Sequence, residues 1–435
     1  MDRFLAQPLT PESLLQLEGL IRAALFRQGA DIVGYLLQAA ADRIDAAYQP
    51  QRRETCKGRE SITVQCLFGT FPLQRDYYYS PFTGGHYPAD AALGLETGYT
   101  PALVRLVCLE GADELGFQKA EKHLLETGGI ALEARQIQRL VQRVGPLAQT
   151  WQQREYKPSP EHPKPVPILY VSADGSGVPM RSEELEGRTG KQTDGTAKTH
   201  QAYLGCVFTQ HEVDAEGHPI RDWESTTYVS SLGSIDVFGP MLRAEALRRG
   251  MGCAEYVVLL VDGAHGLENM GLINFKDAIQ IVDFYHALEH AGLVLAALLG
   301  SKTHPEYDHR RGQWAKRLLN NGVAGLIAST RKECAGQPQA EAVEKELHYF
   351  STNIHRMQYG TFRRLGYFIG SGVIEAGCKT IIGARCKQSG MFWGIPGAEH
   401  ILALRCINAS RRDEPFWTHR LAQLATRNPR RRSVA

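Results

Sequence analysis

Three acidic residues stand at positions in this sequence where carboxylates commonly bind metal ions. Asp174 ends the apolar run VPILYVSAD, Asp262 ends the apolar run YVVLLVD, and Glu375 stands near the start of a later helical segment. Carboxylates gathered around one point repel each other, and bound cations remove that cost. We expect two Mg²⁺ ions, which prefer oxygen ligands, with Mn²⁺ as a substitute. Two such ions about 4 Å apart activate one oxygen and stabilise the leaving oxygen in phosphodiester chemistry.

The order of elements after residue 165 would bring these acids together. Apolar runs predict three strands, then a helix, a fourth strand ending at Asp262, a short helix, a fifth strand and another helix. In such an α/β layer the fourth strand commonly lies beside the first, so Asp174 and Asp262 would be neighbours. This is the ribonuclease H-like arrangement. The expected strand segments are 166–177, 200–210, 226–231, 254–263 and 278–285.

Asp283 competes with Asp262 for the place of the second acid. It ends the expected fifth strand, one strand further from Asp174, so we favour Asp262 and place Asp283 behind the site. An Asp-Gly pair at a strand end is also ordinary turn chemistry. The prediction therefore depends on the combination and order of the acids, not on any one of them.

The segment DFYHALEH offers a different chemistry, because His286-x-x-Glu289-His290 matches an inverted zinc-peptidase pattern. On a helix the two histidines share one face, as two zinc ligands would. The segment follows a strand of the α/β core, where a peptidase helix has no reason to lie. We therefore favour a role for His286 and His290 in shaping the site or contacting DNA, with core packing as the alternative.

Composition narrows the class of protein. Lys plus Arg is 49 and Asp plus Glu is 47, so the net charge of +2 excludes a histone-like chain but permits a nucleic-acid enzyme with basic faces. The nine cysteines contain no CxxC pair, so we expect reduced thiols and no zinc. The N-terminus shows no signal peptide, and the apolar run 291–299 is too short to span a membrane. We expect a cytoplasmic, bacterial nucleoid-associated protein without a membrane partner.

The sequence of the N-terminal half predicts a mainly helical DNA-binding region with a small β-hairpin. Residues 1–50 read as two helices, the first starting at Thr10-Pro11, and Gly69-Thr70 joins two β-rich runs. Segment 101–154 is compatible with a helix-turn-helix around Gly128-Gly129, or with a plain αα-hairpin whose polar face is solvated. In the first reading Arg135, Arg139 and Arg143 suit phosphates and base edges.

Prolines and basic residues indicate the remaining organisation. Segment 155–167 carries five prolines and predicts a stiff linker. Further basic residues suited to DNA phosphates are Lys379, Arg385 and Lys387 after Glu375, and Arg188, Lys191 and Lys198 in the loop 181–200. The expected parts are 1–50, 51–100, 101–154, the linker 155–167, a catalytic domain 168–410 with a helical insertion at about 300–365, and a C-terminal helix with a basic tail at 411–435.

Several long segments resemble the ISKra-type bacterial insertion-sequence transposases. They are DGSGVPM (174–180), residues 186–209, DGA (262–264), IVDFYHALEH (281–290), residues 370–393 and ALRC (403–406). The resemblance covers about 165–410, and the N-terminal half matches more loosely. It implies a DDE transposase distantly similar to the Mutator-like enzymes, with Asp174, Asp262 and Glu375 as the catalytic triad.

This resemblance has one departure and several consequences. Where many relatives carry paired cysteines, residues 77–88 contain none, which supports the expectation of no zinc. The implied activity is Mg²⁺-dependent hydrolysis of a phosphodiester at the element's terminal repeats, followed by strand transfer of the 3′-OH. The implied partners are double-stranded DNA and a second copy of the chain, in a homodimer or larger assembly on DNA. The alternative to an enzyme is a repurposed relative that binds DNA as a regulator without catalysis.

Overall fold

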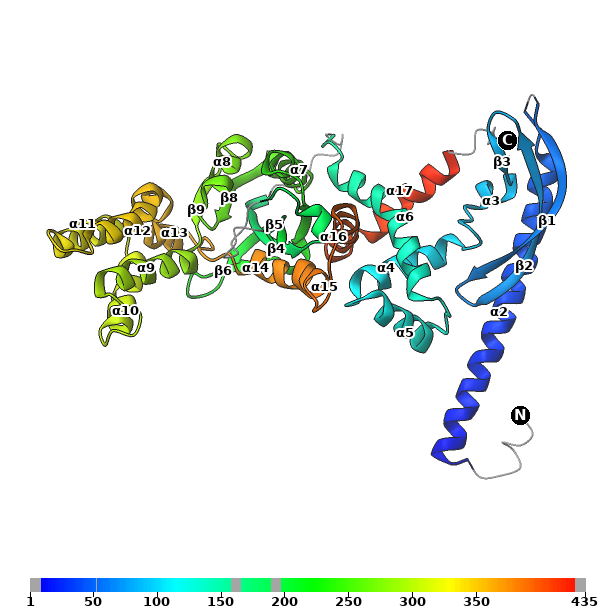
Figure 1. Cartoon of the computed structure of the whole chain (residues 1–435), viewed down its shortest axis with the longest axis horizontal. Coiled ribbons are helices and arrows are strands. Elements are labelled where there is room, and N and C mark those ends of the chain that lie inside the picture. Colours follow the sequence, from blue (N-terminus) through cyan, green and yellow to red (C-terminus); the bar gives the residue numbers. More distant parts are fainter. Residues whose placement is uncertain (1–8, 52, 158–165, 189–196, 427–435) are drawn as a thin grey trace. The chain divides into compact units, whose positions relative to one another are not determined.

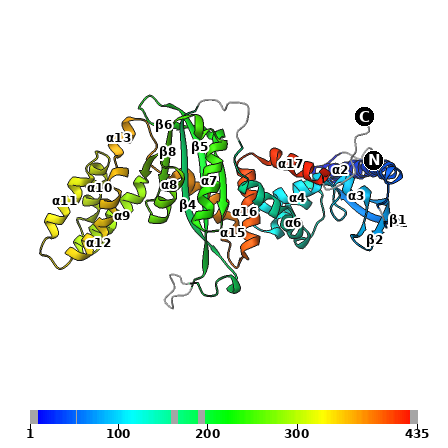
Figure 2. The same cartoon turned by 90° about the horizontal axis from the view of Figure 1, so that it is seen from above.

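The computed structural model describes residues 9–51, 53–157, 166–188 and 197–426. The chain forms two compact units, Met1–Leu147 with Arg412–Ala435, and Ala148–Arg411 (Figures 1 and 2). Most of the proline-rich segment 155–167, the whole basic tail 427–435 and Lys191 lie outside the described residues. No helix in the described part of the chain is both long and apolar enough to cross a membrane.

The first unit begins with one long helix, α2 (Pro11–Ala47). Thr10 caps its N-terminus, because the Thr10 hydroxyl accepts a hydrogen bond from the Ser13 amide and Pro11 occupies the first turn. The expected division into two helices is wrong. A single Gly29 costs a helix only about 1 kcal/mol, and here glycine also permits close packing, since a Cβ at Gly29 would meet the Phe68 ring at 2.9 Å.

A small antiparallel sheet lies against α2. It consists, among the described residues, of β1 (Thr55–Cys66), β2 (Gly69–Ser80) and β3 (Gly84–His86), in that order. The β1–β2 hairpin confirms the expected turn near Gly69. Its core joins Val64, Phe71 and Leu73 to Ala41 of α2.

Short helices complete the first unit. Arg105 of α4 pairs with Asp413 and Glu414 at the start of α17, at 2.7 Å each, and Arg420 of α17 pairs with Glu96. Glu121 of α5 accepts a hydrogen bond from the Ala134 amide at the start of α6. The helices are α3 (Pro88–Leu93), α4 (Pro101–Asp113), α5 (Phe117–Gly128), α6 (Ala134–Gln153), which runs on past the division between the units, and α17 (Asp413–Thr426).

The second unit is an α/β structure built on a mixed sheet of the order β6-β5-β4-β8-β9, with β7 paired to β5. Strand β4 is antiparallel to β5 and parallel to β8, with Ser172 opposite Leu260. The fourth strand of the expected order therefore does lie beside the first. The strands are β4 (Val166–Pro179), β5 (Thr199–Val213), β6 (Pro219–Arg221), β7 (Thr227–Ser231), β8 (Ala254–Val261) and β9 (Ile279–Val282).

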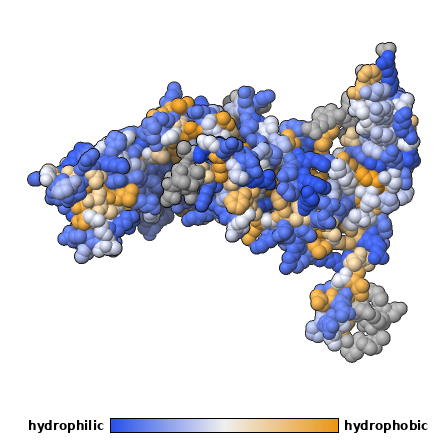
Figure 3. All heavy atoms as spheres, in the orientation of Figure 1, coloured by the Kyte–Doolittle hydropathy of each residue, from blue (hydrophilic) through white to orange (hydrophobic). Residues whose placement is uncertain are grey.

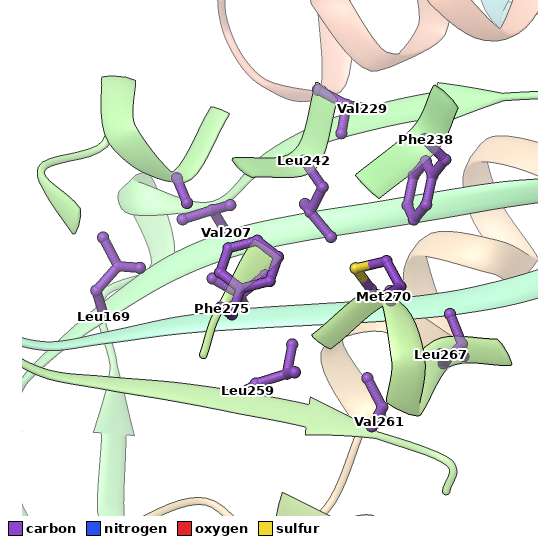
Figure 4. Packing of buried hydrophobic residues seen from close by; sticks show 13 residues of the cluster. Leu169, Val207, Val229, Phe238, Leu242, Leu259, Val261, Leu267, Met270 and Phe275 are labelled. Carbon is purple, nitrogen blue, oxygen red and sulfur yellow. The ribbon is translucent and has the colours of Figure 1, made fainter. Parts of the chain in front are cut away.

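Helices α7 (Ile235–Arg248) and α8 (His265–Asn274) cover one face of this sheet (Figure 2). Their apolar side chains pack on alternate residues of the central strands, and Figure 4 shows the cluster that Phe238, Leu242 and Met270 form with Val207, Leu259 and Val261. Because side chains alternate along a strand, the residues between these face the other side of the sheet. Facing that side are α14 (Gly372–Gly377), a π-helical stretch (Cys378–Gly383), α15 (Ala384–Cys386) and α16 (Ile395–Ala409).

A helical insertion separates β9 from α14; it begins with α9 at Phe284, earlier than the expected start at about residue 300. Strand β9 ends at Val282, so Asp283 does not end a strand as expected but caps the next helix. Single-turn 3₁₀ segments cover Ser182–Glu184, Trp223–Ser225, Met251–Cys253 and Ile354–Arg356. The insertion contains α9 (Phe284–Leu299), α10 (Tyr307–Leu318), α11 (Val323–Cys334), α12 (Ala340–Asn353) and α13 (Tyr359–Arg364).

Candidate active site

Asp174 lies on β4, and Asp262 directly follows β8, the strand paired in parallel with β4. Ser172 of β4 is opposite Leu260 of β8, and each aspartate follows two residues later. Leu169, Val171 and Ala173 pack toward α7 and α8, so the alternation of the strand turns Asp174 toward the opposite face. Asp262 directly follows β8, and its charge acts on the pKa of Asp174, so the two carboxylates lie near each other.

Glu375 approaches this face from α14. The helix contacts β4 and β5, and it comes close because Gly377 has no side chain: a Cβ there would lie 2.8 Å from the Tyr228 ring and 3.1 Å from Leu204. The Ser371 hydroxyl donates a 2.8 Å hydrogen bond to Oε1 of Glu375, one turn along the helix. The carboxylate is therefore oriented by its own helix.

The three carboxylates interact electrostatically. Burial raises the pKa of Asp174, and the charges of Asp262 and Glu375 raise it further. Hydrogen bonds from the Gly175 amide, at 2.6 Å, and from the Cys378 thiol act in the opposite direction on this pKa. The same neighbourhood raises the pKa of Cys378, chiefly through burial and then through the charge of Asp174.

This donor set fits a hard divalent cation, because it offers carboxylate oxygens whose mutual repulsion a cation would relieve. The oxygens are spaced more widely than those of a closed single-ion site. Ligand atoms within 4.8 Å of one another occur, in the described part of the chain, at Glu110, Glu114 and His123 and at Asp214, Glu216 and His218. Neither group includes the three candidate carboxylates.

Asp283 is fully engaged by the backbone. Its side chain is buried, at 1% exposure, with Oδ1 accepting from the His286 amide at 2.6 Å and Oδ2 from the Ser371 amide at 2.5 Å. Asp283 thus joins the start of α9 to the turn before Glu375. Asp262 is only half-buried, and the Ala264 amide donates a 2.8 Å hydrogen bond to its Oδ1. Its charge acts on the pKa of Asp174.

The two histidines of the DFYHALEH segment lie along α9 behind Asp262. Their ring centroids are 5.6 Å apart, and His290 stacks on Tyr349 of α12 at 3.6 Å. Burial lowers the pKa of His290, as does the charge of His286. Within the described residues, neither histidine belongs to a group of three ligand atoms of the kind a zinc site needs.

The basic residues after Glu375 differ in exposure. Lys379 is exposed one helical turn after Glu375. The Lys387 ammonium donates a 2.6 Å hydrogen bond to the Ser176 hydroxyl of β4. Arg385, expected to contact DNA, is instead buried, at 1% exposure, with its guanidinium 5.1 Å from the Trp393 ring. Burial lowers its pKa to about 10. This corrects the expectation for Arg385, because an interior guanidinium presents no surface to a phosphate.

Arg188 and Lys198 are exposed between β4 and β5, at either side of residues that the structure does not describe. Trp393 is largely buried, and its indole N–H donates a 3.1 Å hydrogen bond to the Cys386 carbonyl oxygen. It is a packing residue, not a platform open to a base.

The arginines expected to read DNA lie on one exposed face of α6 in the first unit. Arg135, Arg139 and Arg143 are four residues apart and exposed, so they fall on neighbouring turns of one helix face. The Arg143 guanidinium donates a 2.8 Å hydrogen bond to the Thr97 hydroxyl. This geometry is compatible with a phosphate-binding row and with a solvated helix face alike.

Sequence reasoning missed the residues that position the acids. Ser371 carried a weak signal, since a serine one turn before a helical glutamate can hydrogen-bond to it. Cys378 and Tyr349 carried none, because their contacts to Asp174 and Asp262 join segments distant in sequence.

Comparisons with known proteins give a distant likeness. No family model matches this chain, and no curated protein matches it. Among solved structures, a chain of the Drosophila P element transposase strand transfer complex aligns over 76% of this chain and 83% of its own, at 11% identity and a TM-score of 0.26. This chain therefore has a transposase as a distant structural neighbour, at a similarity too low to establish a common fold.

Proposed function

We propose that this chain is a DDE-type DNA transposase of an insertion sequence, with a ribonuclease H-like catalytic unit. The proposal is supported by the parallel pairing of β4, which carries Asp174, with β8, which Asp262 directly follows, and by the charge interaction of Glu375 of α14 with Asp174. A first strand flanked by an antiparallel second and a parallel fourth strand is the order expected of such a unit.

In this proposal Asp174, Asp262 and Glu375 hold Mg²⁺, or Mn²⁺ in its place. When bound, such ions would activate the attacking oxygen and stabilise the leaving oxygen of a phosphodiester. Ser371 orients Glu375, and the backbone amides at Gly175 and Ala264 fix the two aspartates. The site needs no covalent protein–DNA bond, so no Ser or Tyr nucleophile is assigned.

The cations around the site would bind the DNA backbone. Lys387 lies beside Ser176, two residues after Asp174, and Lys379 is exposed next to Glu375. Ammonium groups at these places can neutralise phosphates without reading sequence. Recognition of the terminal repeats is assigned to the first unit, with the exposed row Arg135, Arg139 and Arg143 as its candidate surface.

The test is cleavage of the flanking terminal-repeat DNA by the full chain with Mg²⁺. We expect wild type to nick the repeat ends, and Asp174→Asn and Glu375→Gln to bind the DNA without nicking it. Glu341→Gln is the matched control, because it removes an exposed acid of α12. It should leave cleavage unchanged.

Other outcomes would reject the proposal in different ways. Binding without cleavage by the wild type, with Mg²⁺ or Mn²⁺, favours a DNA-binding regulator. Zinc-dependent proteolysis that is lost in Glu289→Gln and kept in Asp174→Asn favours the peptidase reading of the α9 segment.

A further inference from the structure

Helix α2 has two apolar faces, and within the described residues of the first unit only one of them is covered. Ala30, Gly34 and Ala41 are buried on one side, where Gly34 meets Phe71 of β2. The N-terminal half of the helix extends beyond that sheet (Figure 1), and orange apolar residues are visible on this projecting part in Figure 3. On the uncovered side the exposed apolar side chains, with their exposed fractions, are Leu14 44%, Ile21 41%, Leu25 61%, Ile32 56%, Tyr35 77% and Leu36 59%. Leu15 at 72% and Leu20 at 53% are exposed on other sides of the helix.

These exposed residues follow a coiled-coil spacing. Steps of four and three residues alternate from Leu14 to Tyr35, which is the a/d pattern of a heptad repeat. At about 100° per residue this row lies opposite the side that packs on β2. The full row is Leu14, Glu18, Ile21, Leu25, Gln28, Ile32 and Tyr35.

The face is large enough to hold a partner. From Leu14 to Tyr35 the row runs about 32 Å along the helix. Its large apolar residues, with Leu36 at its edge, expose on the order of 700 Å², close to the ~800 Å² that each partner buries in a standard interface. An exposed apolar patch of this size marks an interaction surface more often than a solvated one.

We propose that this face of α2 binds the same face of a second copy of the chain, with the two helices antiparallel. A parallel pair would put Glu18 against its own copy in the seam, where like charges repel. In the antiparallel register that puts Leu25 opposite Ile21, Ile32 meets Leu14. Glu18 then meets Gln28, so the polar residues of the seam pair with each other and the apolar residues do likewise.

This association is independent of the proposed function, because it requires no DNA. Sedimentation of the full chain in the absence of DNA should give a dimer. Leu25→Glu/Ile32→Glu adds two like charges to the seam and should shift the chain to monomer at the same concentration. Arg27→Glu is the matched control: it also changes the charge by −2, at an exposed position off the row, and should leave the dimer intact.

Circular dichroism of each variant shows whether the helix is retained, so that dissociation is not confused with unfolding. A monomeric wild type would overturn the proposal, since the face would then be covered from within the chain or left open. A dimer that persists in Leu25→Glu/Ile32→Glu would overturn it as well, because the contact would lie elsewhere.

Cross-linking tests the orientation. In the proposed register Ile21 of one copy meets Leu25 of the other, whereas each of these residues meets its own copy only in a parallel pair. With the exposed Cys56 and Cys253 replaced by serine, a mixture of Ile21→Cys and Leu25→Cys chains should form a mixed interchain disulfide on oxidation and neither variant alone should form one, because a disulfide needs Cβ atoms about 4 Å apart. A cross-link of either variant with itself, or none in the mixture, would overturn the register.

Discussion

The hydroxyl of Tyr349 donates a 2.8 Å hydrogen bond to the backbone carbonyl oxygen of Asp262. Tyr349 belongs to α12 in the helical insertion and Asp262 follows β8 in the sheet, so this bond ties the insertion to the candidate active site. It fits closely, since a Cβ at Gly263 would lie 2.9 Å from the same hydroxyl. The insertion is therefore part of what holds the second acid in place.

Removing this bond should impair catalysis more than DNA binding. Tyr349→Phe keeps the stack on His290 and loses only the hydroxyl, which costs about 1 kcal/mol of folding stability. We expect a several-fold lower cleavage rate constant under single-turnover conditions and an unchanged Kd for the terminal repeat. Tyr285→Phe, at an exposed hydroxyl of α9, is the control; an equal loss in both variants would contradict a positioning role for Tyr349.

Stability should separate Asp283 from Asp174. Asp283→Asn places an amide N–H₂ against a backbone N–H in a buried site, so it should lower the free energy of unfolding by about 1–3 kcal/mol. Asp174→Asn removes a charge that burial and its neighbours disfavour, so metal-free protein should become more stable while cleavage is lost. Urea unfolding in the presence of EDTA measures the free energy of unfolding of each variant. If Asp283→Asn is fully stable and abolishes cleavage, Asp283 and not Asp262 is the second acid.

The α4–α5 contact should depend on pH. Nδ1 of His123 lies 2.6 Å from the Glu110 carboxylate, and this hydrogen bond raises the pKa of His123 above its ordinary 6.5. Protonation then favours the folded state, so the gain is fully present below pH 6.5 and is lost as pH rises through the folded pKa. The difference in melting temperature between wild type and His123→Gln should therefore shrink as pH rises from about 5.5 to about 8.5. A constant difference would show that the pair contributes no charge interaction.

The α6 row should contribute phosphate contacts. Replacing Arg135, Arg139 and Arg143 by alanine should weaken terminal-repeat binding and reduce the slope of log K against log salt by about 0.9 for each lost contact. The control replaces the exposed lysines Lys316, Lys332 and Lys345 of the insertion, with the same loss of charge. Equal losses in the two triple variants would mean that α6 acts only through net charge.

The local pattern of the sequence predicted the strands and helices of the second unit well, because buried runs and their order are local properties. It also predicted that Asp174 and Asp262 would be neighbours, and β4 and β8 are paired in parallel. It failed where packing overrides local signals. Residues 1–50 were expected to form two helices, yet α2 runs unbroken from Pro11 to Ala47 and Gly29 within it packs on Phe68.

The sequence by itself determined which residues carry charge and the order of the strands that position two of the acids. It placed Asp174 at the end of its strand, whereas β4 runs on to Pro179. Only the tertiary structure decided that Asp283 is engaged by two backbone amides, that Arg385 is interior and that Tyr349 reaches Asp262. The physical reason is that burial and hydrogen bonding at these positions come from segments up to 88 residues away along the chain, and no local periodicity records such contacts.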